Sequence, residues 1–167
     1  MREYFTKALV LDQKNAGEYD KRIILFTEEM GKVSAKAKSA RKITSKLSGH
    51  LQPGNLVQAR LVEKNGLQIV DALKISKLDF ELADLYSLDN ILADNEPDPR
   101  LWHLLSAGKF NWPQILTILG WDPREAICHL CSAGEPAAFS IFGQEFFCAP
   151  CSLKLSQKEL LYMNARH

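Results

Sequence analysis

Residues 21–38 read KRIILFTEEMGKVSAKAK. Residues 21–27 are rich in Ile, Leu and Phe, as expected of a buried strand. Residues 28–31 make a tight connection, in which Gly31 is free to take the positive φ that such turns need. Residues 32–38 then alternate polar and small apolar side chains. The stretch therefore predicts two antiparallel strands joined by a short turn.

The second of these strands carries positive charge on one face only. A strand alternates its faces, so one face receives the polar residues Lys32, Ser34, Lys36 and Lys38. The other face receives the small apolar residues Val33, Ala35 and Ala37. A polar outer face is common in solvated sheets. An ordinary exterior mixes charges of both signs, however, and this one does not.

The charge continues beyond the strand. Residues 31–60 contain no Asp or Glu, although the whole chain has a formal net charge of only +1. Clustered cations repel one another unless a polyanion, either nucleic acid or an anionic membrane, neutralises them. The candidate nucleic-acid contacts are Lys32, Lys36, Lys38, Arg41, Lys42 and Lys46.

The flanking sequence supplies three further strands, at 2–11, 56–62 and 67–75, with a polar loop over 12–20. The last two strands are joined at Lys64-Asn65-Gly66, and an Asn-Gly pair between strands is a strong hairpin signal. Five short antiparallel strands with a long third connection match an OB-fold barrel. We therefore expect an OB-fold nucleic-acid-binding domain over residues 1–76.

Residues 77–167 are expected to form a small helical domain, which makes the fold class α+β. Leucines follow a helical period from 78 to 92, residues 95–99 (NEPDP) interrupt it, and further helices are expected at 100–106 and between Pro113 and Gly120. Residues 78–99 hold seven acidic residues and no Lys or Arg, which is typical of a solvated helix face. The three tryptophans of this half are expected to be core anchors.

Four cysteines form two CxxC pairs: Cys128, Cys131, Cys148 and Cys151. The segment between the pairs (AFSIFGQEFF) predicts a hairpin that turns at Gly143. Two such knuckles facing each other complete a four-thiolate zinc ribbon, expected at about residues 126–153. A closed thiolate set leaves no position for activated water, so one Zn²⁺ is expected to be structural. Paired redox thiols are the alternative.

The sequence contains no nucleophile elbow, phosphate-binding glycine loop or HExxH motif, so we expect no catalytic residues and no enzyme activity. No apolar run approaches the roughly 20 residues that span a bilayer. The N-terminus carries Arg2, Glu3 and Lys7 and no small-residue cleavage site, unlike a secretory signal. We expect a cytoplasmic protein with no membrane partner.

The order of these parts resembles a known family. The segments GEYD (17–20), FTEEMGK (26–32), AKSARKITSKL (37–47) and LQPGNL (51–56), followed by the four cysteines, are similar to the bacterial recombination mediator family RecO. The resemblance covers residues 8–70 and 119–151, well over half of the chain. The chain is short for that family, and the shortfall lies between Ser76 and Pro113 and beyond His167.

The resemblance implies a non-catalytic, nucleoid-associated DNA-binding protein of recombinational repair. Such proteins bind single- and double-stranded DNA and anneal complementary strands. They act with RecR and with single-stranded DNA-binding protein, which has an acidic C-terminal tail, and so assist indirectly in loading the RecA recombinase. Two other functions remain open from the residues themselves: an RNA-binding protein, or a protein adaptor whose basic patch meets an acidic peptide.

Overall fold

The computed structural model describes residues 1–40 and 45–164. The chain divides into two compact units, Met1–Gly108 and Lys109–His167, and each is described by itself. The first unit contains the barrel strands and two helices, and the described part of the second contains two helices, a 3₁₀ turn, a small three-stranded sheet and the four cysteines. The domain division after residue 76 stays a prediction.

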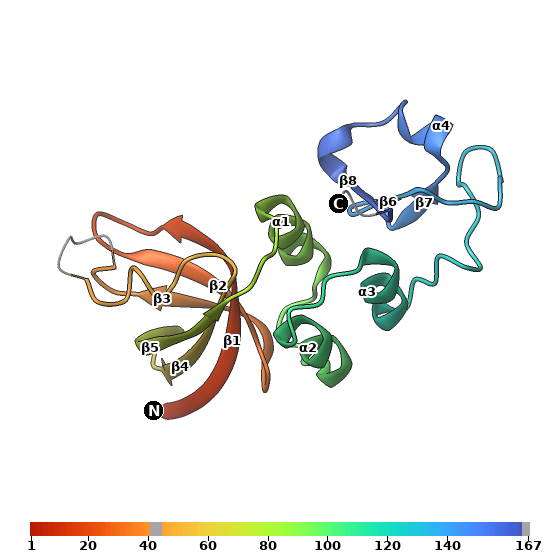
Figure 1. Ribbon diagram of the computed structural model, residues 1–167. Coiled ribbons are helices and arrows are strands. Elements are labelled where there is room, and N and C mark those ends of the chain that lie inside the picture. Colours follow the sequence, from red (N-terminus) through yellow and green to blue (C-terminus); the bar gives the residue numbers. More distant parts are fainter. Residues whose placement is uncertain (41–44, 165–167) are drawn as a thin grey trace. The chain divides into compact units, whose positions relative to one another are not determined.

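Five strands form the predicted barrel (Figure 1). They are β1 (Arg2–Asn15), β2 (Lys21–Thr27), β3 (Gly31–Ala37), β4 (Asn55–Glu63) and β5 (Leu67–Lys77). Their order around the closed barrel is β1-β2-β3-β5-β4, and β4 returns to pair with β1. The expected OB-fold barrel is therefore confirmed.

One pairing differs from the antiparallel expectation. Strand β3 runs parallel to β5, with Lys36 opposite Gln68, whereas the other neighbouring pairs are antiparallel. The reason is geometric. Strand direction cannot alternate all the way around a closed ring of five strands, because an odd number leaves at least one pair pointing the same way.

Strand β1 is longer than predicted and pairs with two neighbouring strands, β2 and β4. Its first half pairs with β4 and its second half pairs with β2, while a register shift lies between Val10 and Asp12. Such a bulge bends a strand without ending it. The predicted loop over 12–20 was therefore too long, because β1 continues to Asn15. The polar residues after the bulge stand on the barrel wall.

The barrel interior is filled by small and branched side chains. The buried cluster includes Ala8, Val10, Ile23, Leu25, Val33, Ala35, Ala37, Val57, Ala59, Leu61, Ile69 and Ala72. Strand β3 contributes only Val33, Ala35 and Ala37 to this cluster. The alternation predicted for β3 is therefore confirmed, because its small residues are buried and its polar residues face outward.

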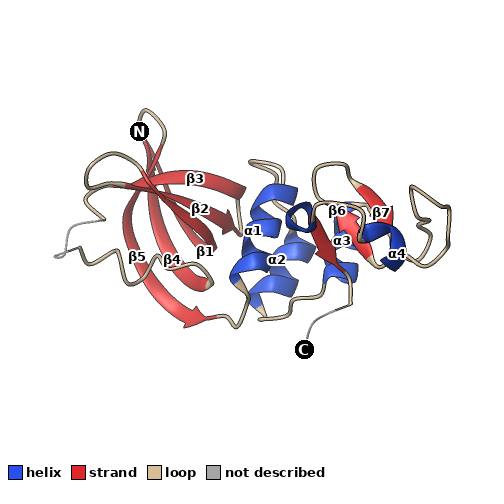
Figure 2. Ribbon diagram, turned by 90° about the horizontal axis from the view of Figure 1, so that it is seen from above, coloured by secondary structure: helices blue, strands red, loops and turns tan. Residues whose placement is uncertain are grey.

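Helices α1 (Leu82–Ile91) and α2 (Pro99–Ser106) lie beside the barrel (Figures 1 and 2). Asp98 caps α2 by accepting hydrogen bonds from the backbone N–H groups of Arg100 and Leu101. Trp102 is buried on α2, and its ring centroid lies 6.0 Å from that of Phe26 on β2. Trp102 is thus a core anchor, as predicted. None of the helices among the described residues has the length and apolar character needed to cross a membrane.

The connection between α1 and α2 packs against the start of β3. The backbone N–H of Asn95 donates to the carbonyl oxygen of Lys32 over 2.8 Å. Gly31 approaches this connection so closely that an added Cβ would lie 2.3 Å from the carbonyl carbon of Glu96. Gly31 also has φ +69°, so glycine is needed here for two reasons.

The second unit begins with α3 (Trp112–Leu119), which starts after the cap Asn111 and ends at Gly120 with φ +102°. Its Pro113 and Gly120 confirm the predicted bounds. The remaining elements are β6 (Ala138–Ser140), β7 (Glu145–Phe147), α4 (Ala149–Ser152), the 3₁₀ turn η1 (Gln157–Glu159) and β8 (Leu160–Tyr162).

Strands β6 and β7 form the predicted hairpin, whose turn includes Gly143. Strand β8 was not predicted, and it pairs with the free edge of β6 to give the order β7-β6-β8. Phe139 of β6 is fully buried, and its ring centroid lies 5.3 Å from that of Trp121. Trp112 is buried as well. These two tryptophans are also packing residues.

We expect Gly31→Ala to destabilise the barrel unit much more than Gly17→Ala does. Gly17 also has positive φ, but an added Cβ meets nothing within 4 Å there. Each change strains the backbone by about 1 kcal/mol. The added clash with rigid backbone at Gly31 should cost about 2 kcal/mol more. Urea unfolding followed by Trp fluorescence measures the difference, and equal losses would show that the 94–97 segment does not pack tightly on β3.

Candidate nucleic-acid interface and metal centre

The structure distributes the predicted contact residues over the outer side of β3 and the segment after it. Lys36 is partly exposed, and Lys38 and Lys46 are exposed. Lys32 is mostly buried. Arg41 and Lys42 lie outside the described residues. The described lysines are therefore not equivalent.

Lys32 is neutralised within the barrel unit. Its side chain is only 13% exposed, and its Nζ lies 3.5 Å from Oδ1 of Asp89 and 3.3 Å from Oδ1 of Asp94. The same Nζ donates to the backbone oxygen of Asp89 over 2.6 Å. Two carboxylates of the acidic segment 78–99 thus balance the first lysine of the basic segment. This ion-pair cluster ties α1 and the following connection to β3.

Lys36 also has an acidic partner, but in a more open setting. Its Nζ lies 2.8 Å from Oδ2 of Asp20, and the two side chains are 43% and 25% exposed. The other carboxylate oxygen of Asp20 accepts the backbone N–H of Ser39 over 2.7 Å. The hydrogen bond from Lys36, followed by that from Ser39, lowers the pKa of Asp20 below its usual range. Asp20 is therefore a fixed anion among the cations.

Two further cations share the outer face with Lys36. Arg22 of β2 is directly opposite Lys36, and Lys14 of β1 is directly opposite Arg22. Residues directly opposite on neighbouring strands point to the same face. Because adjacent strands lie roughly 4.8 Å apart, the row Lys14–Arg22–Lys36 sets three cations within about 10 Å across the barrel. We call this set the cation row.

The cation row is open to solvent, although its members also make polar contacts. Arg22 is exposed and donates to the hydroxyl of Ser34 over 3.1 Å. Lys14 is 61% exposed and lies 3.8 Å from a carboxylate oxygen of Asp12. Their guanidinium and ammonium groups can therefore reach an external anion. The face is a cationic strip that runs across the strands and continues to Lys38.

Sequence reasoning missed Lys14 and Arg22. Arg22 could have been predicted from the sequence, because a turn that pairs Thr27 with Gly31 also pairs position 22 with position 36. Lys14 was not, because residues 12–20 were predicted to be a loop. The bulge that carries β1 onward has no clear signal in the sequence.

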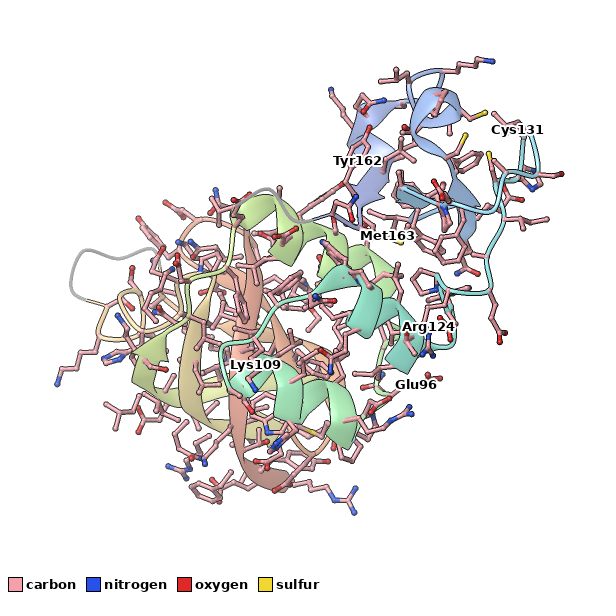
Figure 3. The ribbon with its side chains drawn as sticks, turned by 45° about the vertical axis from the view of Figure 1, so that its right-hand side comes forward. Glu96, Lys109, Arg124, Cys131, Tyr162 and Met163 are labelled. Carbon is pink, nitrogen blue, oxygen red and sulfur yellow. The ribbon has the colours of Figure 1, made fainter. Side chains whose placement is uncertain are left out.

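The four cysteines come together as predicted. Their sulfur atoms all lie within 4.8 Å of one another, and the sulfurs of Cys131 and Cys148 are 3.6 Å apart. Four sulfurs at about 2.3 Å from a tetrahedral ion stand about 3.8 Å apart. Figure 3 shows sulfur atoms gathered beside Cys131. The donor set therefore fits one metal ion in four-thiolate coordination.

Backbone turns hold the thiols in place. In the first knuckle, Cys128 N–H donates to the oxygen of Ala133, and Ser132 N–H donates to the oxygen of Cys128. In the second, Ser152 N–H donates to the oxygen of Cys148. Three cysteines are buried and Cys131 is exposed. His129, between two ligands in sequence, instead lies 3.4 Å from a carboxylate oxygen of Glu145.

The thiols differ in how readily they ionise. Burial raises the pKa of Cys128, but hydrogen bonds from the backbone of Cys148, Cys131 and Leu130 outweigh it and bring the pKa to about 6. The pKa of Cys151 is raised to about 12, first by its hydrogen bond with the Cys148 side chain and then by burial. One thiolate is thus favoured by the fold alone. A bound cation would supply the charge that ionises the others.

A closed barrel with a cationic outer strip, together with a four-cysteine cluster suited to a metal ion, defines an OB-fold and metal-ribbon protein. The family model for the recombination protein O N-terminal domain matches residues 1–78. Relatives match across both units. The chain is thus similar to RecO-family proteins over most of its length.

Three relatives illustrate the match, and each is described as a DNA repair protein RecO. The protein of Heliobacterium modesticaldum is 35% identical over 86% of this chain and 60% of its own length. That of Myxococcus xanthus is 29% identical over 92% of this chain and 75% of its own length. That of Bifidobacterium longum is 26% identical over 87% and 72%, respectively. The chain thus spans about 60 to 75% of the length of these relatives.

We expect Lys32→Met to lower the stability of the barrel unit without weakening nucleic-acid binding. The change leaves the Asp89 carboxylate, which is only 14% exposed, without its ammonium partner. Breaking a largely buried pair from one side costs on the order of 3 kcal/mol. Lys38→Met on the same face is the matched control, and an exposed change of this kind stays within about 0.5 kcal/mol. Urea unfolding and DNA titration of both variants test this. Loss of binding with unchanged stability would contradict it.

Metal removal should loosen residues 126–153 and leave the barrel folded. The buried cluster around the cysteines is small, so the ion supplies much of the order there. Elemental analysis should find one metal ion per chain, and Cys131→Ser should lose it while His129→Ala keeps it. Amide hydrogen exchange with and without a strong chelator measures the local effect. Equal loosening of the strands β1–β5 would show instead that the two units fold as one.

Proposed function

We propose that this protein is a non-catalytic DNA-binding protein of recombinational repair. It binds single- and double-stranded DNA through phosphate contacts, anneals complementary strands and assists in loading a recombinase. The observation that carries this proposal is the cation row with Lys38, on the outer face of a barrel whose fold class commonly binds oligonucleotides. The similarity to DNA repair proteins of the RecO family supports the repair context.

The chemistry of the face favours phosphate contact over base reading. The cations of this face are ammonium and guanidinium groups, which suit a phosphate backbone of any sequence. Binding is therefore largely independent of sequence and falls steeply with salt, because each phosphate contact releases counterions. Annealing follows from the same mode. Neutralised phosphates let two strands approach, while their bases stay free to pair.

The expected partners belong to the same proposal. They are RecR and single-stranded DNA-binding protein, whose acidic C-terminal tail is a suitable ligand for a basic surface, with RecA affected indirectly. The protein acts in the cytoplasm, on the nucleoid, and has no membrane partner. The metal ion is Zn²⁺, because four thiolates in tetrahedral arrangement suit zinc, and its role is to hold the ribbon in shape.

Two charge-matched variants test the interface. The first changes three of the predicted contact residues, Lys38, Lys42 and Lys46, to Glu. The second changes the exposed lysines Lys109, Lys154 and Lys158 of the other unit to Glu and has the same net charge. We expect the first variant to bind single strands at least about tenfold more weakly. The slope of log K against log salt concentration should become shallower by about 2, since each lost phosphate contact removes about 0.7. The second variant should bind like the wild type.

Fluorescence anisotropy at stepped salt measures binding, and annealing of strands coated with single-stranded DNA-binding protein measures the mediator activity. Equal binding by the two variants would refute the site. A marked preference for matched RNA would favour the RNA-binding alternative. Capture of an acidic peptide, without measurable affinity for nucleic acid, would favour the adaptor alternative.

A further inference from the structure

The loop between β1 and β2 places a carboxylate within the cationic strip. Asp20 lies 2.8 Å from the ammonium of Lys36, and Lys36 is directly opposite Arg22. The charge of Lys38 also acts on Asp20 and favours its ionised form. An anion in this position neutralises part of the surface that we propose for phosphate.

Asp20 is held in place by a second contact that does not involve a lysine. Its Oδ1 accepts the backbone N–H of Ser39 over 2.7 Å, and Ser39 has φ +56° in the turn that follows β3. The carboxylate therefore spans the loop and the start of the basic segment after β3. It cannot turn away from Lys36 without giving up this backbone hydrogen bond.

The ion pair is nevertheless accessible to an external anion. The side chain of Lys36 is 43% exposed and that of Asp20 is 25% exposed. This contrasts with Lys32, whose pairing with Asp89 is largely closed to solvent. A phosphate can thus approach the Lys36 ammonium and compete with the carboxylate for it. A carboxylate and a phosphate oxygen accept from an ammonium group in the same way.

We propose that Asp20 is a built-in competitor of backbone phosphate, which weakens the grip of the interface on nucleic acid. This inference rests on the proposed function and names a regulation of the same site. A phosphate that binds Lys36 must either displace the Asp20 carboxylate or share the ammonium with it. Lys36 therefore adds less to the affinity for nucleic acid than a lysine without an acidic partner would. A weakened grip favours release of the strands once they have annealed. Asp20 thereby sets the affinity of the surface.

The test compares Asp20→Asn with Glu18→Gln. Both remove one negative charge from the same loop. Glu18 is exposed, and the ion pair of Lys36 is made with Asp20 and not with Glu18. Asp20→Asn keeps an oxygen that can accept the backbone N–H of Ser39. We expect Asp20→Asn to bind single-stranded DNA about fivefold more tightly. The salt slope should become steeper by about 0.7, as one more phosphate contact forms. Annealed product should also leave more slowly.

A double-mutant cycle with Lys36→Met separates competition for Lys36 from a general charge effect. In the Lys36→Met background, Asp20→Asn should raise the affinity for single-stranded DNA no more than Glu18→Gln does. Urea unfolding and the exchange rate of the Ser39 amide serve as structural controls, and both should stay close to wild type in Asp20→Asn.

The outcomes separate the two proposals. If the wild type binds DNA and Asp20→Asn behaves like Glu18→Gln, the competitor role is wrong and the proposed function stands. If neither the wild type nor Asp20→Asn binds, both are wrong. If only Asp20→Asn binds measurably, the competitor role is supported and the wild-type surface is too strongly restrained to bind alone.

Discussion

The register between β2 and β3 is the constraint on which the rest of this structure depends. Thr27 stands opposite Gly31, and this single pairing fixes the facing of every residue along both strands. It turns the small residues of β3 into the barrel and its lysines outward. A slip of one residue would turn Lys32 and Lys36 into the barrel and expose the alanines. Burying two unpaired ammonium groups would cost far more than any surface contact could return. The apolar packing of the barrel and the pattern of surface charge therefore have one origin.

The same register explains why the charges of the chain are segregated. Lys32 leaves the turn at the point where the connection 94–97 crosses, and there it meets Asp89 and Asp94. Gly31 permits this approach because it has no side chain. Part of the acidic segment thus completes the packing of the barrel unit, while Asp98 caps α2. Some of the opposite charges that balance in the sequence are therefore also paired in space, within the barrel unit.

Much of the fold could be predicted because its signals are local. The alternation on β3, the Asn-Gly hairpin, the proline and glycine around α3 and the CxxC spacing each act within a few residues. The missing parts depend on contacts between distant segments. Strand β8 is only three residues long and needs the free edge of β6. Lys14 joins the cation row only because a bulge extends β1, and Asp20 reaches Lys36 from the loop that precedes β2, beside the Lys21–Ala37 pair.

The lysines on β3 and in the turn after it become more exposed from Lys32 to Lys38, and their roles differ accordingly. At Lys32 the ammonium is enclosed by acidic partners, so its charge contributes to the fold and is poorly available to a ligand. At Lys36 the pair is open on one side, so an external anion and the internal carboxylate can exchange. At Lys38 the side chain is exposed, and its charge is available to solvent. A uniform row of free lysines would bind phosphate more strongly but would leave α1 and its connection without their anchor on β3. The graded arrangement lets one strand stabilise the unit at one end and present a moderated cationic surface at the other.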